Sequence, residues 1–249
     1  MKNSYSKRYS NLSKSSKERT ELEGYPTEFD SFVLSYLTLR RLIGFLGISL
    51  PVICLISSLF YESPILPSIS HYYHSTCKIV FSSVLLLLTI FLWTYHGADK
   101  YERGICRALA IMALLIVIFP TTNDLCILKE CYTTDDLKSF VFPAIVGQPW
   151  IGVIHLISAA IFFVLLIALI FFKFIPHEQK KDNPDQIAIR IYKFCGWGMV
   201  LSMLGIVATM PFSQSFKDWR LPPTFSFETL SLICFGVSWL TKGESFKSE

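Results

Sequence analysis

The chain has 249 residues, of which 52% are hydrophobic and 17% are charged, and its formal net charge is +4. Soluble globular domains carry about 25% charged residues, and a soluble domain of this length could not bury so much apolar surface. The composition therefore excludes a disordered chain, a disulfide-rich secreted module, a coiled coil and most soluble enzymes. It indicates an integral membrane protein.

In chain order, the predicted elements begin with a polar, basic and partly disordered cytoplasmic arm at residues 1–40. A helix that crosses the hydrocarbon core needs about 20 mostly apolar residues. Six stretches fit, namely residues 41–60, 77–95, 105–120, 150–172, 191–210 and 225–240. Their runs do not alternate in polarity as barrel strands would. The predicted fold is all-α, a polytopic bundle of six transmembrane helices within residues 41–241, followed by a short cytoplasmic tail at residues 242–249.

The distribution of basic residues predicts how the bundle is oriented. Of the 23 Lys and Arg residues, 18 lie on the side of the membrane that would hold both termini. Because cytoplasmic segments are enriched in Lys and Arg, we expect both termini in the cytoplasm and the protein in a bacterial cytoplasmic (inner) membrane. The expected partners are membrane lipids, whose anionic headgroups attract a basic surface. Nucleic acid is not expected, because no basic folded domain lies outside the spans.

On this topology, histidines and carboxylates gather at the outer ends of four helices. The segment SISHYYHS places His71 and His74 before the second span, and Asp124 follows the third. His155 and Glu228 each lie about one turn inside the fourth and sixth spans. Ionisable groups within spans are costly and usually face the bundle interior or a cavity. These five residues are therefore the candidate site.

Several interpretations of this site remain open. His74, His155, Glu228 and Asp124 are candidate catalytic acid–base groups that act on or bind an outer-leaflet lipid, while His71, His74 and His155 are candidate ligands of a zinc ion. A path for a proton or a small solute is an alternative, as is a membrane scaffold. Interfacial anchoring and helix–helix hydrogen bonding would explain the same residues without any activity.

Three further features of the sequence carry predictions. Cys126 and Cys131 lie in the long outer loop, where they could form a disulfide in an oxidising compartment. The turn YHGADKYERG (residues 95–104) is predicted to be a solvated connector with ion pairs, or else an inner-leaflet headgroup site. The fifth span carries small residues on one side, which predicts close helix packing or a homo-oligomer; they are Gly196, Gly198, Ser202 and Gly205.

The order of several short motifs resembles a known family. SISHYYHS, LWTYHGADKYE, FPT, IHLISAAIFF, IRIYKFCGWGM and FETLSLICFGVSWLTKGE occur in this order over roughly residues 40–244. Together they are similar to a family of small bacterial six-helix integral membrane proteins, the group called domain of unknown function 998, which is loosely related to DRAM-like membrane proteins. The resemblance implies the six-helix layout and points to Tyr72, Tyr73, Asp99, Pro120, His155 and the Glu228 helix. It implies no activity.

Overall fold

The computed structural model describes residues 28–60, 64–75, 77–121, 149–212 and 219–244, and these contain helices and no β-strand. The chain divides into two units, residues 1–38 and residues 39–249. In the first unit, the described residues 28–38 form the beginning of helix α2. Apart from this beginning of α2, the features below belong to the second unit.

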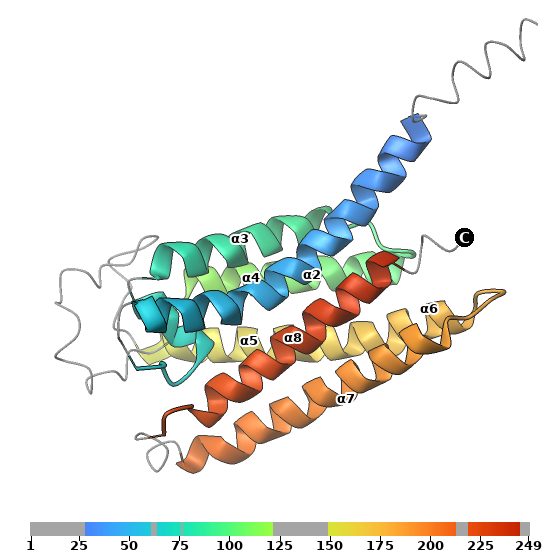
Figure 1. Cartoon of the computed structure of the whole chain (residues 1–249). Coiled ribbons are helices and arrows are strands. Elements are labelled where there is room, and N and C mark those ends of the chain that lie inside the picture. The colour runs from blue at the N-terminus through green and yellow to red at the C-terminus, as the bar shows by residue number, and fades with distance from the viewer. Residues whose placement is uncertain (1–27, 61–63, 76, 122–148, 213–218, 245–249) are drawn as a thin grey trace, which may run out of the picture. The chain divides into compact units, whose positions relative to one another are not determined.

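The helices follow one another along the chain as Figure 1 shows. They are α2 (Glu28–Phe60), the 3₁₀ turn η1 (Ile69–His74), α3 (Lys78–Thr94), α4 (Lys100–Ile118), α5 (Pro149–Leu169), the π-helical turn η2 (Ile170–Phe174), α6 (Ile175–Gln179), α7 (Gln186–Thr209) and α8 (Pro223–Glu244). Helix α5 runs through η2 into α6 as one rod. Helix α8 continues past the predicted domain boundary at residue 241.

Four of the helices are long and apolar enough to cross a membrane. They cover Leu37–Phe60, Trp150–Gln179, Gln186–Phe212 and Pro223–Gly243, which correspond to the first, fourth, fifth and sixth predicted spans. Helix α3 is apolar but has 17 residues, and α4 begins with the charged segment KYERGICR. The second and third predicted spans, and the orientation of the termini, stay predictions.

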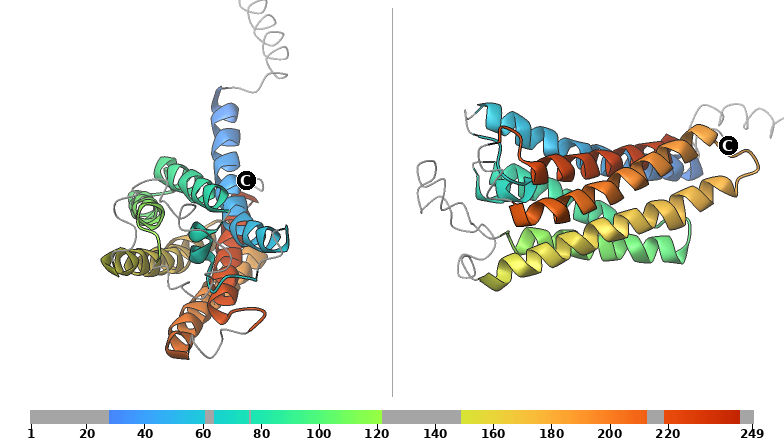
Figure 2. Two further views of the ribbon diagram at one scale, coloured as in Figure 1. Left: turned by 90° about the vertical axis from the view of Figure 1, so that its left-hand side faces the viewer. Right: turned by 90° about the horizontal axis from the view of Figure 1, so that it is seen from below.

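Helix packing depends on small residues where α2 crosses α8 (Figure 2). A Cβ atom built on Gly236 would lie 2.5 Å from the backbone oxygen of Gly44, and one built on Gly44 would lie 2.8 Å from the oxygen of Gly236. The two backbones therefore touch directly, as is common where membrane helices cross. Helices α7 and α8 pack side by side, and α4 packs between α3 and α5.

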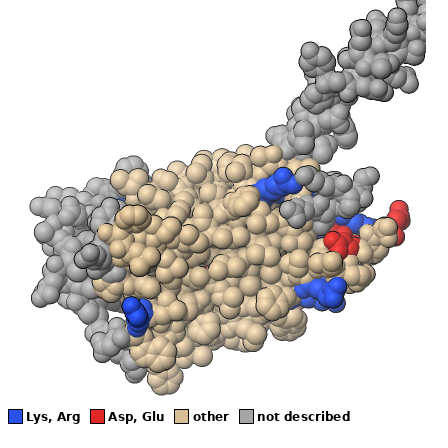
Figure 3. Space-filling model, viewed as in Figure 1, with Lys and Arg blue, Asp and Glu red and all other residues tan. Residues whose placement is uncertain are grey.

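The surface of the bundle is apolar. Leu59, Phe60, Phe172 and Phe194 are each more than 70% exposed, which would be a liability for a protein in water. On the face drawn in Figure 3, the charged side chains of the described residues lie near the two ends, and an uncharged belt separates them. Lipid tails are the solvent that such a belt requires.

Candidate functional site

Two polar clusters lie at opposite ends of the bundle. The first, which we call the histidine end, contains His71, His74, His155 and Glu228. The second, the basic end, contains Arg40, Glu102, Glu178 and Lys242, all 2% exposed or less. The sequence predicted the first cluster and not the second.

At the histidine end, the turn η1 is bonded to the helices around it. The backbone N–H of Ile69 donates to Oε2 of Glu228 in α8 at 2.6 Å. The hydroxyl groups of Tyr72 and Ser58 are hydrogen-bonded at 2.5 Å, which ties η1 to α2. The Ser68 hydroxyl and Nδ1 of His71 are also 2.5 Å apart, within the turn. Glu228 therefore satisfies a backbone donor that has no helical partner.

His74 and His155 both bond to the chain at the end of α4. Nε2 of His74 lies 2.8 Å from the carbonyl oxygen of Thr121, and Nδ1 of His155 lies 2.8 Å from that of Phe119. A carbonyl only accepts, so both of these nitrogens carry the proton. In the neutral ring of His155, the lone pair is then on Nε2. That atom is buried and has no hydrogen-bond partner among the described residues.

The histidines of η1 are held in their neutral form. Burial lowers the pKa of His71 to about 4, and repulsion by His74 and His155 adds to the effect. Burial also lowers the pKa of His74, against the opposing influence of the Thr121 carbonyl. Neutral imidazoles accept protons and hydrogen bonds, so this end of the bundle suits a ligand that donates.

The structure thus places four of the five predicted site residues at one end of the bundle. His71, His74 and His155 influence one another electrostatically, whereas the contact of Glu228 is with Ile69. Asp124 lies outside the described residues, as do Cys126 and Cys131. Within the described ranges, no group of three or more His, Cys, Asp or Glu side chains is arranged to hold a metal ion. The zinc site at His71, His74 and His155 stays a prediction, without support from this geometry.

At the basic end, Glu102 is buried at the start of α4. The Tyr95 hydroxyl donates to its Oε1 at 2.8 Å, and the Ala98 N–H donates to its Oε2 at 3.0 Å. Arg40 lies over the Tyr95 ring, 5.6 Å from its centre, and donates to the Lys242 carbonyl at 3.3 Å. A charge is tolerated at such depth when it is paired and hydrogen-bonded.

Lys242 completes this cluster from α8. Its Nζ lies 4.9 Å from the centre of the Phe174 ring, buried and without a hydrogen-bond partner among the described residues. Phe174 ends the π-helical turn η2, a distortion that is frequent at functional sites. Glu178, one turn further on, accepts from Lys181 and from the Asp185 N–H, both at 3.3 Å.

The turn at residues 95–104 is therefore only partly a solvated connector. Asp99 pairs with Lys173 at 2.8 Å near the surface, and this bond lowers the pKa of Asp99. Tyr95 and Glu102, in contrast, are at most 1% exposed. The sequence held one signal for this cluster, since Lys242 lies 14 residues after Glu228, which is four turns along the same face of α8.

The small residues of the fifth span pack within the chain. A Cβ on Gly196 would meet the Phe171 ring at 2.8 Å, and one on Gly205 would meet the Phe227 ring at 2.5 Å. Gly198 faces the Cys234 sulfur, and Ser202 is fully buried. Helix packing at these positions follows from the contacts, whereas a homo-oligomer through them stays a prediction.

No family model, curated protein or solved structure matches this chain. The resemblance to the six-helix bacterial family therefore stays a prediction. The helices themselves define the class: this is an α-helical integral membrane protein.

Proposed function

We propose that this membrane protein binds a hydroxyl-bearing lipid at its histidine end, with His155 as the hydrogen-bond acceptor. The observation that carries the proposal is the lone pair of His155 Nε2, which is buried and has no partner within the described part of the chain, while Nδ1 is held by Phe119. A buried polar atom without a hydrogen bond costs about 1–3 kcal/mol, so a ligand hydroxyl that donates to it would recover this energy.

The surroundings suit such a ligand. His71 and His74 are neutral and half-buried or buried beside His155, and α5 is apolar along its length. A lipid hydroxyl would lie at the depth of His155 and its tail along the apolar helices. In an enzyme, the same imidazole would serve as the general base that removes the hydroxyl proton.

Paired substitutions at one position test the proposal. His155→Asn keeps an amide N–H near the place of Nδ1 to donate to Phe119 and removes the acceptor at Nε2. The side chain of His155→Gln is one methylene longer, so its amide oxygen keeps an acceptor near the position of Nε2. With dioctanoylglycerol as the probe, we expect the ligand-induced rise in unfolding temperature to need about tenfold more lipid in His155→Asn and to be largely retained in His155→Gln. Equal binding by wild type and His155→Asn would contradict the proposal.

The second candidate function is translocation of a proton or a small solute, and one observation favours it. Glu228, Ser231, Ser238 and Lys242 lie on one face of α8, so polar groups extend from the histidine end to the basic end. The hydroxyl groups of Ser231 and of Ser202 in α7 are fully buried and have no partner within the described residues. Unsatisfied hydroxyls inside a bundle indicate a place for water or a solute.

Proteoliposomes test this candidate. We expect wild-type protein to dissipate an imposed proton gradient, read with a pH-sensitive dye, and Ser231→Leu to abolish the leak by filling the polar face. Ser83→Leu is the matched control, because Ser83 is an exposed serine of the apolar helix α3. A gradient that wild type and both variants leave intact would refute proton translocation.

A further inference from the structure

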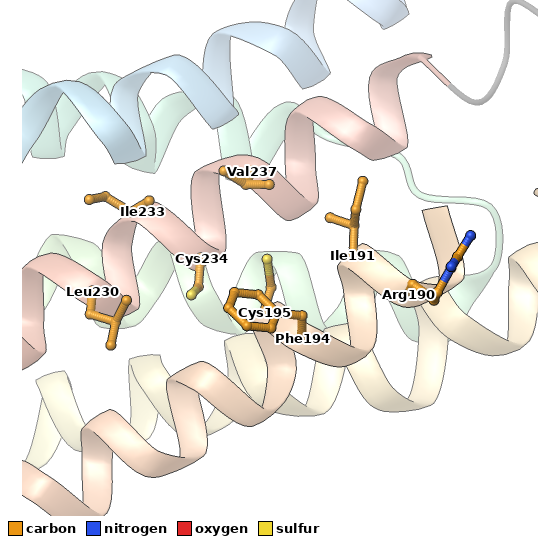
Figure 4. A pocket seen from close by; sticks show the side chains of 8 residues that line it. All are labelled: Arg190, Ile191, Phe194, Cys195, Leu230, Ile233, Cys234 and Val237. Carbon is orange, nitrogen blue, oxygen red and sulfur yellow. The ribbon is translucent and has the colours of Figure 1, made fainter. Parts of the chain in front are cut away.

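A groove runs between α7 and α8 on the outside of the bundle (Figure 4). It has a volume of about 380 Å³. Cys195 and Cys234 face each other across it from the two helices, and Phe194 and Ile233 line it. The groove extends from Leu230 to Val237 on α8, which is about 10 Å along a helix.

The position of the groove decides what can fill it. Both of its helices are long and apolar enough to cross a membrane, and Phe194 is 76% exposed beside it. The groove therefore opens toward hydrocarbon, where an acyl chain is the ordinary solvent. Its length and its apolar walls suit part of one such chain.

One end of the groove carries a cation. Arg190 is the one charged residue among those that line it, and its side chain is exposed. Its Nε donates to the Gln186 carbonyl at 3.3 Å, which anchors the side chain and leaves the terminal amino groups for a ligand. A guanidinium binds phosphate through two parallel hydrogen bonds. An apolar channel that ends at an arginine complements a lipid tail that ends at a phosphate.

We propose that this groove binds an anionic phospholipid, with one acyl chain over Cys195 and Cys234 and the phosphate on Arg190. This site is separate from the one proposed at His155. It differs in chemistry as well, because Arg190 requires a phosphate and His155 a hydroxyl. The alternative occupant is a second copy of the chain. It would have to place an acidic side chain on Arg190 and apolar side chains in the groove.

The test compares two substitutions that each remove one positive charge. Arg190→Gln removes the phosphate partner, and Lys193→Gln is the control, since Lys193 is exposed one turn away and does not line the groove. Short-chain phosphatidic acid is titrated into the purified full-length protein in neutral detergent, and binding is counted by native mass spectrometry. We expect Arg190→Gln to weaken binding about fivefold, the effect of one cation at a membrane surface, and Lys193→Gln to leave it unchanged. Equal weakening in both variants would overturn the proposal.

A third variant tests the acyl chain separately from the phosphate. Ile233→Trp fills the groove from a position that is 38% exposed, where a larger side chain has room. We expect it to abolish the specific binding of phosphatidic acid. The rise in unfolding temperature with dioctanoylglycerol, which depends on His155, should stay the same. Unchanged phosphatidic acid binding in Ile233→Trp refutes the groove site. If Ile233→Trp changes the oligomeric mass and leaves lipid binding unchanged, the proposal is also refuted, and the groove is then an interface with a second copy of the chain.

Discussion

The crossing of α2 and α8 yields the sharpest prediction about stability. In Gly236→Ala, the new Cβ would lie 2.5 Å from the Gly44 oxygen, and ordinary contacts begin at 3.4 Å. The helices must therefore separate by about 0.9 Å, against packing that is as dense as a crystal. Overpacking of this kind costs about 1–3 kcal/mol, and the better helix propensity of Ala returns about 1 kcal/mol at most. Because the same Cβ would also lie 2.5 Å from the Ile48 side chain, the cost belongs in the upper part of that range, and we expect a net loss of about 1–2 kcal/mol in the free energy of unfolding.

The measurement is reversible unfolding in mixed micelles, followed by circular dichroism. Gly104→Ala is the matched control, because a Cβ there meets nothing within 4 Å and should leave stability equal or slightly raised. The double variant Gly44→Ala/Gly236→Ala should cost less than the sum of the single variants, since one separation of the helices relieves both clashes. A Gly236→Ala protein as stable as wild type would refute the reasoning.

The remaining predictions concern charge and topology. The pKa of His71 is about 4 when folded and near 6.5 when unfolded, so the unfolded chain binds the extra proton between these values. The free energy of unfolding should therefore fall by up to about 3 kcal/mol as the pH drops from 6.5 to 4. In His71→Ala it should fall by less over the same pH range. Glu102→Ala should destabilise the protein by about 1–3 kcal/mol, because it removes the carboxylate that accepts from the Tyr95 hydroxyl and the Ala98 N–H; an unchanged midpoint of thermal unfolding would contradict this. In intact cells, an impermeant thiol reagent should label a cysteine placed at Ser75 and not one at Lys100; the reverse pattern would invert the predicted orientation.

Much of the histidine end was predictable because it depends on local pattern. Hydropathy predicts where a span begins and ends, and so it places His155 and Glu228 about one turn inside their helices. Two residues that lie at the same depth near the outer ends of their spans must then share one end of the bundle. Their partners were not predictable, because the Phe119 and Ile69 backbone groups reach them only through the packing of other helices.

What the sequence alone determined is the class of the protein, since a long apolar run is costly anywhere except in a membrane. Tertiary structure decided the rest. Glu102 and Lys242 are 140 residues apart along the chain, and only the assembly of the helices into a bundle buries both at one end. The groove at Arg190 likewise exists only because α7 and α8 lie side by side. Burial and pairing are properties of the space between helices, whereas hydropathy is a property of each helix by itself.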